Sequence, residues 1–555
     1  MIANDMPGRP DSAPTVDVAV IGGGPAGASA ARLLAAWGHS VLLLTRSDAG
    51  TPSLAESLPP SCRKVFEAVG VRQAIEAAGF LTASGNTVCW GGGAPRVASF
   101  GGGRVGHQVL RRDLDRLLLA EARRAGAVVR TGVTVRHAAL PGGSLRREGE
   151  EAPAAGSSGS PDATGGVRGD SSAGRVTGRD DRGDAVEAMA RMVLDCSGRT
   201  GVVARRYRTR VRAGETTLAL LGVWRCDDGW PPLDSASGSA TESETDGGAH
   251  TVVEAYRDGW AWSVPVSSRR RYVTVMVDPR TTETEHPGSL AARYAAELGK
   301  TRHLTRMTAG ATLESPPWAC DASQYGARRF GGPGFFLVGD AATFIDPLSS
   351  FGVKKAMASG WLAAVAANTC LRHPERGELA RHFHADREQE VWASYRRQAA
   401  AFFAQVSAKE LHPFWNDRAD PVVVESTADR SGAADAVEAF RRDPAVRDAF
   451  EALRRAPSIR LRPTRDARTT TAPAVVGREI VPDASLSIAA GEAGTVTIRY
   501  LRGVDLPALV GMAGQRSQVP DLYETYRRSH PPVELADFLG ALSVLLGKGL
   551  LRNDI

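Results

Sequence analysis

The sequence predicts a mixed α/β fold whose core is a parallel sheet. An apolar, β-branched run at 16–21 ends in a glycine-rich turn, and a helix-like stretch and a second apolar run at 41–44 follow it. Another apolar run at 335–338 ends in a Gly-Asp pair before a helical pattern over 352–368. Two neighbouring strands that are connected by a helix run parallel to each other. The first of these segments therefore predicts a Rossmann-like βαβ unit.

The other segments predict an antiparallel sheet and a C-terminal extension. Residues 216–225 and 250–278 alternate apolar and polar positions, as strands do when one face of their sheet is covered. We expect this sheet to cover the substrate. Later, two strand-like pieces precede three short helices, an order that suggests a winged helix. The predicted parts are a main unit at 14–405, a helical extension and Pro/Thr-rich linker at 406–475, and a winged-helix-like domain at 476–555.

Composition excludes several classes of protein. With 43% hydrophobic and 23% charged residues, the 555-residue chain is not disordered as a whole, although the Gly-, Ser-, Asp- and Arg-rich segment 141–186 predicts a disordered surface insertion. The 68 Lys and Arg exceed the 62 Asp and Glu by only 6, so we expect no nucleic-acid partner. Six scattered cysteines indicate a reducing cytoplasm and no metal site. No apolar run predicts a membrane span.

The first cofactor signal is Gly22-x-Gly24-x-x-Gly27, placed between the first predicted strand and its helix. Glycines here permit a tight turn and close backbone approach, so that the helix N-terminus can hold a pyrophosphate. The acidic residue that would bind a ribose about twenty residues later is missing. Thr45 and Arg46 end the second strand instead, and we assign them to the adenosine end of the cofactor.

The second cofactor signal follows the strand at 335–338. Asp340 is placed where a carboxylate can bind a ribityl hydroxyl, and Pro347, Gly352 and Val353 lead into a helix whose N-terminus can face a flavin ring that becomes anionic when reduced. Together with the glycine turn, this pattern favours FAD over NAD. A plain helix cap is the alternative interpretation of Asp340.

Residues 14–400 resemble the flavin-dependent halogenases and their monooxygenase relatives. The motifs that carry this resemblance are the glycine turn, Glu56 to Lys64 (ESLPPSCRK), Arg111-x-x-Leu114-Asp115, Asp195 to Gly198 (DCSG), Trp260 to Pro265 (WAWSVP) and Gly339 to Gly352. The resemblance implies an FAD-binding fold of the GR2 monooxygenase type and assigns Arg111 to the FAD phosphate or ribose. A surface arginine at a helix start is the alternative for Arg111. Because a second dinucleotide motif is missing, we expect a separate flavin reductase to supply the reduced FAD.

By resemblance, Lys64 is the catalytic residue. In tryptophan halogenases a flavin C4a-hydroperoxide oxidises the halide, and a lysine at this place receives the hypohalous acid and presents it to the substrate; a desolvated lysine can react in this way. O2 and chloride or bromide would then be co-substrates. Lys64 also falls in an amphipathic pattern, SCRKVFEAVG, in which a solvated surface lysine is the alternative.

Four further residues are assigned to the substrate side by resemblance. Trp260 and Trp262 resemble the WxWxIP signature, which lies between flavin and substrate; two ordinary core tryptophans are the alternative. Ser349 stands where free-tryptophan halogenases place a glutamate, and the turn continues with Ser350. Small residues here are typical of phenol and pyrrole halogenases. We therefore expect an electron-rich phenol, a pyrrole or an indole within a peptide as substrate.

Three functions remain open from the sequence. The first is FAD-dependent halogenation of a small-molecule, carrier-bound or peptide aromatic substrate in a biosynthetic pathway. The second is a monooxygenase that hydroxylates an aromatic side chain such as peptidyl tryptophan. The third is a flavin-containing protein that only binds a peptide or carrier. Under the two enzymatic functions, the domain at 476–555 is a candidate to dock the carrier or peptide.

Overall fold

The chain divides into two compact units in a computed structural model. The first unit contains Met1–Arg372 and Gln398–Pro421, and the second contains His373–Arg397 and Val422–Ile555. The residues that the structure describes are 14–48, 50, 52–92, 95–140, 173–208, 215–231, 249–281, 288–419, 439–456, 458–491, 494–516 and 518–554. Within these ranges, none of the helices is both long and apolar enough to cross a membrane.

A sheet with a parallel centre organises the cofactor half of the first unit. Its order is β19-β20-β11-β1-β2-β8, and the five strands from β20 to β8 run parallel. Their bounds are β1 Thr15–Ile21, β2 Val41–Thr45, β8 Val128–Thr131, β11 Ala185–Asp195, β19 Gly331–Gly332 and β20 Phe335–Leu337. Val18, Ala19 and Val20 are fully buried, as central strands covered on both faces require. The predicted Rossmann-like unit is confirmed.

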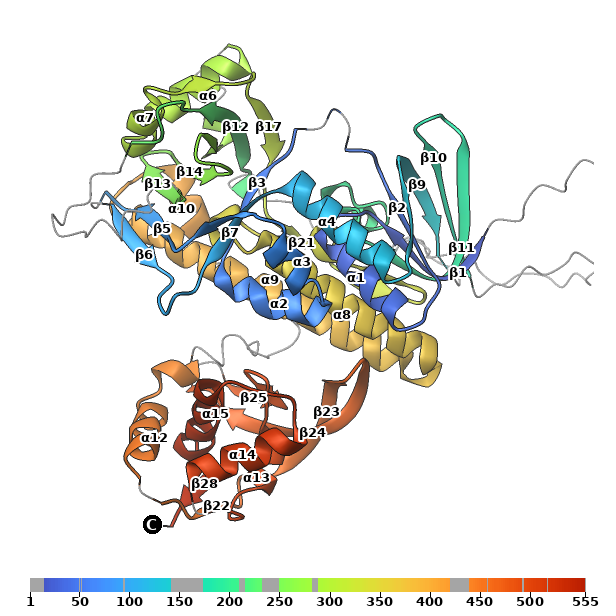
Figure 1. The fold of residues 1–555 in the computed structure, drawn as a ribbon, viewed down its shortest axis with the longest axis vertical. Coiled ribbons are helices and arrows are strands. Elements are labelled where there is room, and N and C mark those ends of the chain that lie inside the picture. The colour runs from blue at the N-terminus through green and yellow to red at the C-terminus, as the bar shows by residue number, and fades with distance from the viewer. Residues whose placement is uncertain are drawn as a thin grey trace, which may run out of the picture. The chain divides into compact units, whose positions relative to one another are not determined.

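Three helices complete this layer. They are α1 (Pro25–Ala36), α4 (Arg111–Arg124) and α8 (Gly352–Arg372), and α1 packs against both others, as Figure 1 shows. The crossing of α1 and α8 is close, because a Cβ on Gly360 would lie 2.3 Å from the Ala26 carbonyl oxygen. The absence of a side chain at Gly360 thus lets α8 approach the helix that follows the glycine turn.

The predicted antiparallel sheet is also present in the first unit. Its order is β16-β12-β15-β14-β13-β5-β6, with β17 also paired to β12, and only the β13–β5 pair is parallel. The strands are β5 Gly85–Cys89, β6 Arg96–Ser99, β12 Leu218–Arg225, β13 Thr251–Tyr256, β14 Gly259–Pro265, β15 Arg270–Val277, β16 Thr312–Leu313 and β17 Trp318–Asp321. Helices α6 (Leu290–Gly299) and α7 (His303–Thr308) pack against this sheet. Their Leu298 and Leu304 belong to one buried apolar cluster with Val273 and Val275 of β15.

Short elements connect the two sheets of the first unit. A three-stranded sheet has the order β3-β7-β4. The remaining elements of the unit are β3 Ala55–Leu58, α2 Arg63–Val69, α3 Arg72–Ala77, β4 Leu81–Ala83, β7 Gly106–Leu110, β18 Tyr325–Gly326, β21 Thr343–Phe344 and α10 Pro413–Ala419. Helix α9 (Gly377–Ser407) contributes residues to both units.

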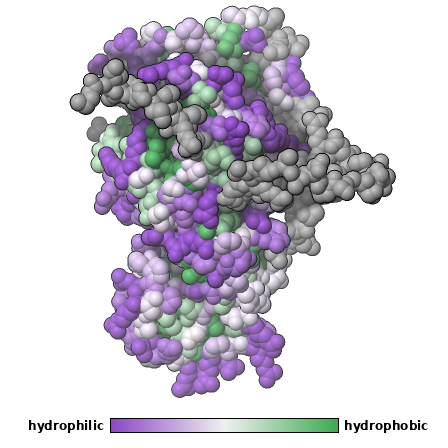
Figure 2. All heavy atoms as spheres, turned by 90° about the vertical axis from the view of Figure 1, so that its right-hand side faces the viewer, coloured by the Kyte–Doolittle hydropathy of each residue, from purple (hydrophilic) through white to green (hydrophobic). Residues whose placement is uncertain are grey.

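Figure 2 shows that hydrophilic residues cover most of the visible face, while apolar residues form small groups.

One correction concerns the insertion predicted at 141–186. Residues 174–180 form β10 and 185–195 form β11, which pair with each other, and β10 also pairs with β9 (Val133–Ala139). The prediction was therefore wrong for 174–186, whereas 141–172 lie outside the described residues. Buried Val176 and Val186 hold this hairpin to the unit, but the polar residues between them hid the alternation.

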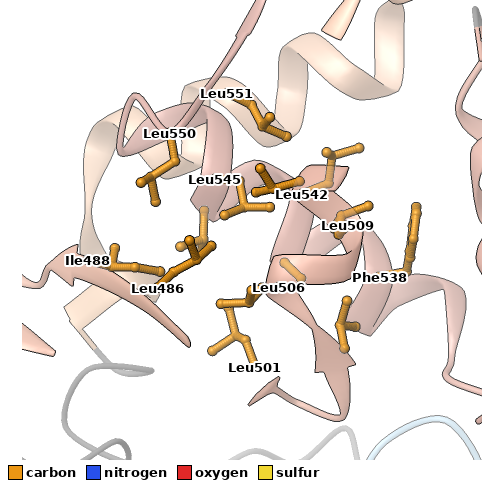
Figure 3. Packing of buried hydrophobic residues seen from close by; sticks show 14 of the residues in the cluster. Leu486, Ile488, Leu501, Leu506, Leu509, Phe538, Leu542, Leu545, Leu550 and Leu551 are labelled. Atoms are coloured by element: carbon orange, nitrogen blue, oxygen red, sulfur yellow. The ribbon is translucent and has the colours of Figure 1, made fainter. Parts of the chain in front are cut away.

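The second unit has its own core. Figure 3 shows how Leu486 and Ile488 from a strand meet Leu509, Phe538 and Leu542 from helices. Its elements are α12 Pro444–Arg455, β22 Leu461–Pro463, β23 Thr469–Val476, β24 Glu479–Ala489, β25 Thr495–Ile498, β26 Tyr500–Leu501, β27 Val504–Asp505, α13 Leu506–Gly511, α14 Val519–Ser529, α15 Leu535–Gly547 and β28 Leu551–Asn553. Three helices follow the strands, in the predicted order; the description as winged-helix-like stays a prediction.

A second correction concerns the linker and its boundary at 475. Residues 469–476 form β23, an edge strand paired with β24, so the boundary falls inside a sheet. Threonine favours strands, and a proline such as Pro473 is tolerated at a sheet edge. Pro and Thr were interpreted as linker residues, but here they form part of the second unit.

Candidate active site

One cavity joins the two sheets of the first unit. Its volume is about 200 Å³, and its lining combines the glycine turn at the end of β1 with the Asp340 turn after β20. The opposite wall is mostly apolar and comes from the antiparallel sheet, including Trp262, Val264 and Met276. Ligands of open α/β sheets bind at the carboxyl ends of the strands, which is where this cavity lies.

The glycine turn is packed so closely that side chains are excluded at two positions. Gly22 has a φ of 104°, and a Cβ there would lie 2.3 Å from the Cys196 carbonyl oxygen. A Cβ on Gly27 would lie 2.0 Å from the Gly22 carbonyl oxygen. Gly24, which lines the cavity, has only Arg111 nearby. The turn brings bare backbone to the cavity at Gly24.

The N-terminus of α1 faces this region without a side-chain cap. The residue before the helix is Gly24, and the helix begins at Pro25, so no side chain accepts a hydrogen bond from the first N–H groups. Both Gly24 and Pro25 line the cavity. An open helix N-terminus attracts anions, because its N–H groups and the helix dipole are both positive.

Arg111 carries the charge beside this turn. Its guanidinium lies 3.5 Å from Glu56 and 3.2 Å from Asp115, and all three side chains are only partly exposed. Burial raises the pKa of Glu56 above its ordinary 4.5, and the Asp340 charge adds to that shift, while Arg111 opposes it. Arg111 and Glu56 line the cavity, so a cation and a weakly acidic carboxyl face the same space.

The Asp340 turn forms the floor of the cavity. Asp340, Pro347, Gly352 and Val353 all line it, and their assignment to a flavin stays a prediction. Ser350 also lines it and has a φ of 52°, the left-handed region that favours glycine. This strain is compatible with a backbone that serves the site.

Asp346 holds the turn between these residues in place. Its Oδ1 accepts a hydrogen bond from the Leu348 backbone N–H at 2.9 Å, and its Oδ2 accepts one from Gln324 at 3.1 Å. Asp346 is 5% exposed, and burial raises the pKa of its carboxyl. Ser349 donates to the Asp346 carbonyl oxygen at 3.0 Å and is not among the lining residues, so its hydroxyl stabilises the turn.

The two predicted tryptophans have different positions. Trp262 lines the cavity, whereas Trp260 is 1% exposed and packs edge-to-face on Trp262 with ring centroids 5.9 Å apart.

Thr45 and Arg46, assigned to the adenosine end, lie outside the cavity lining. A Cβ on Gly23 would lie 2.9 Å from Thr45, so Thr45 packs directly behind the glycine turn.

Lys64 lies outside the lining residues. It is exposed on α2, the amphipathic helix that the sequence predicts. Lys354, at the start of α8, donates to the Ser61 hydroxyl at 3.1 Å. Burial lowers the pKa of Lys354, and the charge of Lys64 lowers it further. Lys64 therefore acts electrostatically on a residue next to the lining residue Val353.

Two thiols border the cavity. Cys196 follows β11, and Cys320 lies on β17. Burial raises the pKa of both thiols, and Arg199 partly opposes the shift at Cys320.

The residues present fit FAD. The Gly22 to Gly27 turn forms a cradle that a Cβ would fill, the α1 N-terminus and Arg111 suit a pyrophosphate, and Asp340 offers a carboxylate for a ribityl hydroxyl. The wall beyond, which includes Trp262, Val264 and Met276, is mostly apolar.

Comparison with known protein families agrees that the chain has an FAD-binding domain. The profile of the FAD binding domain matches residues 15–142. The profile named tryptophan halogenase matches residues 145–453, which is more than half of the chain. The chain belongs to the tryptophan halogenase family. It is thus an FAD-dependent oxidoreductase, and the alternative of a flavin protein that only binds a partner loses its support.

Individual relatives agree with this membership. A tryptophan 2-halogenase of Chondromyces crocatus is 28% identical over 406 residues, covering 72% of this chain and 69% of that protein. The flavin-dependent halogenase armH3 of Armillaria mellea is 25% identical over 447 residues, covering 76% and 82%.

Solved structures share the fold over nearly the whole chain. The flavin-dependent halogenase CmlS matches with a TM-score of 0.67 and 21% identity, covering 97% of this chain and 96% of its own. The peptidyl tryptophan dihydroxylase QhpG matches with a TM-score of 0.59 and 21% identity, covering 97% and 100%.

Sequence reasoning assigned no role to two residues of the site. Glu56 and Asp346 were noticed only as parts of the motifs at 56–64 and 339–352. Their signal, charged residues inside otherwise buried segments, was visible, but their roles depend on partners far away in the sequence.

Proposed function

We propose that this enzyme halogenates an electron-rich aromatic group with reduced FAD, O2 and chloride or bromide. The observation that carries the proposal is the cavity in which residues fitted to FAD meet an apolar wall, in a family whose curated relatives are named halogenases. In the overall reaction, the aromatic C–H bond is replaced by a carbon–halogen bond. Anionic reduced FAD and the substrate are oxidised, O2 is reduced to two waters, and two protons are consumed.

Each group of site residues has a proposed role toward one part of FAD. Arg111 and the N-terminus of α1 hold the FAD pyrophosphate, and Asp340 binds the ribityl chain. Thr45 and Arg46 lie toward the adenosine end. The turn at 347–353 faces the flavin ring and offers backbone N–H groups to a halide. When bound and reduced, FAD reacts with O2 and supplies the oxidising equivalent, and a separate flavin reductase is the proposed source of its electrons.

The wall of the cavity supports the substrate class. Trp262, Tyr272 and Met276 give it flat or flexible apolar surfaces that suit an aromatic ring. A phenol, a pyrrole or a peptide indole is therefore the proposed substrate. We also propose that the second unit, which contains residues 476–555, docks a carrier or peptide that bears the substrate.

Halide dependence tests the proposed reaction. The full-length protein, supplied with FAD, NADH, a flavin reductase and bromide, is expected to convert a phenol or an indole peptide into a product in which bromine replaces hydrogen. Mass spectrometry detects the isotope pattern, and the same mixture without halide is the control. A product formed equally well without halide would contradict halogenation.

Direct hydroxylation is the second candidate, and one observation favours it. Among the residues that the structure describes, no lysine lines the cavity. The lysine that relays hypohalous acid in the proposed halogenation is therefore not part of the cavity wall. In a hydroxylation, one oxygen atom of O2 enters the aromatic C–H bond and the other leaves as water. A mass increase of one oxygen, labelled when ¹⁸O2 is used, would identify this reaction.

The relay role of Lys64 has its own test. If Lys64 presents hypohalous acid, Lys64→Ala is expected to lower halogenation at least about 100-fold, as loss of a covalent relay does. Oxidation of reduced flavin should continue, because Lys64 lies outside the cavity lining. Arg63→Ala is the control, since Arg63 is an exposed cation on the same helix that pairs with Glu67 at 3.1 Å. Halogenation that persists in Lys64→Ala would end the assignment.

A further inference from the structure

A buried lysine lies directly beneath the cavity floor. Lys355, in the first turn of α8, has a side chain that is 1% exposed. Its ammonium donates to the Gly339 carbonyl oxygen at 2.8 Å and to the Thr343 carbonyl oxygen, and it lies 3.6 Å from the Asp340 carboxylate. One cation thus joins both ends of the Asp340 turn.

The turn around Asp340 is also held by other hydrogen bonds, including the backbone bond from the Ala342 N–H to the Gly339 carbonyl oxygen at 3.1 Å. The Gly339 N–H donates to the Ser359 hydroxyl at 2.7 Å, and Tyr325 donates to the Asp340 carbonyl oxygen at 2.5 Å. Gly339 has a φ of 63°, so the chain turns sharply where β20 ends. Lys355 therefore bridges the Gly339 and Thr343 carbonyls beside the Asp340 carboxylate, in addition to these bonds.

The Lys355 ammonium has an unusual position for a charged group. Lysine normally extends its ammonium to water, and a buried ammonium is costly unless it is paired and hydrogen-bonded. Here the ammonium lies next to a carboxylate that lines the cavity, and the lining residues Gly352, Val353 and Ala356 belong to the same stretch of α8. Because the Lys355 side chain is 1% exposed, solvent screens its charge less than it would screen the charge of a surface lysine.

The neighbouring lysine has a different environment. Lys354 is half-buried, bonds to Ser61 and lies 4.9 Å from the Phe351 ring centre. These two contacts lie away from the Asp340 turn, although Lys354 precedes Lys355 directly. Successive helix residues point in different directions, so this pair provides one cation under the turn and one beside it.

We propose that Lys355 is a positioning residue that tunes the site toward reduced FAD. It holds the Asp340 turn in its binding conformation, and its buried charge stabilises the negative charge that a flavin gains on reduction. Reduced FAD then binds more tightly than oxidised FAD. This role rests only on FAD binding, so it holds for halogenation and for hydroxylation alike.

The experiment compares Lys355→Gln with Lys354→Gln in the full-length protein. Glutamine keeps an N–H donor for the turn but removes the charge, so it separates hydrogen bonding from electrostatics. The dissociation constants of oxidised and reduced FAD are measured anaerobically, together with the midpoint potential of the bound flavin. Thermal unfolding of the cofactor-free proteins shows whether each variant folds.

In Lys355→Gln we expect the preference for reduced over oxidised FAD to fall about tenfold, which corresponds to a midpoint potential about 30 mV lower for a two-electron couple. Lys354→Gln should change neither quantity by more than about twofold. If Lys355→Gln fails to fold, Lys355→Arg, which keeps the charge, is expected to retain the wild-type preference. An unchanged preference in folded Lys355→Gln, or an equal fall in Lys354→Gln, would overturn the proposal. Loss of halogenation with this preference intact would count against the proposed reaction only.

Discussion

Gly27→Ala is expected to destabilise the first unit by about 1–3 kcal/mol, because overpacking of a rigid contact costs this much. The new Cβ would lie 2.0 Å from the Gly22 carbonyl oxygen, and it would also approach Cys196 at 3.1 Å. Backbone at the end of a central strand cannot move away freely, so α1 must shift. Urea unfolding of the cofactor-free protein measures the loss, and FAD titration should show that binding is lost with it.

Gly24→Ala is the matched control for this prediction. Gly24 has a φ of −72°, which any residue adopts, and a Cβ there would meet only Arg111 at an ordinary 3.6 Å. Its free energy of unfolding should change by less than about 0.5 kcal/mol. FAD affinity should still fall, because Gly24 lines the cavity. Equal stability of the two variants would show that the close contact at Gly27 does not exist.

Arg111→Met is expected to weaken FAD binding by about 10- to 100-fold, because a hydrogen bond to a charged group contributes roughly 1.5–3 kcal/mol. The same change leaves Glu56 and Asp115 without their cation. Titration of FAD fluorescence measures the affinity. Arg116→Met is the control, since Arg116 is an exposed arginine on the same helix that pairs with Asp48 at 2.9 Å. Equal affinities of the two variants would remove Arg111 from the cofactor site.

The stability of Arg111→Met should depend on pH in a defined direction. Burial already raises the pKa of Glu56, and removal of Arg111 takes away the charge that opposes this shift. A carboxyl whose folded pKa is raised stabilises the fold at pH values below its ordinary 4.5 and loses that contribution as the pH rises through the folded pKa. The deficit relative to wild type should therefore be larger at pH 8 than at pH 5. Adding Glu56→Gln should remove most of this difference.

Local patterns predicted the parts of the site that depend on nearby residues. The glycine turn and the Gly-Asp pair each combine a strand end with a helix start, and backbone geometry alone determines what such a turn can do. These features predicted the two turns that line the cavity. The alternation of apolar and polar residues at 250–278 likewise predicted an antiparallel sheet. Successive side chains of a strand point to opposite faces, so this pattern depends only on neighbouring residues.

Partnerships between distant residues could not be predicted in this way. Glu56 and Arg111 meet because β3 pairs with β7, and Lys355 reaches Gly339 because α8 packs against the turn after β20. The distinction between Trp260 and Trp262 also needed the packing, since two tryptophans at i and i+2 share one face of a strand. Only their neighbours decide which of them reaches the cavity.

The two thiols beside the cavity bear on how long the enzyme survives its own chemistry. A thiolate is the form that strong oxidants attack first, and the reaction proposed here would release an oxidant within reach of Cys196 and Cys320. Burial keeps both in the less reactive protonated state. Under the proposed reaction, we expect the packing that shapes the cavity also to slow self-inactivation, and the number of turnovers per protein molecule to depend on the burial of these two side chains.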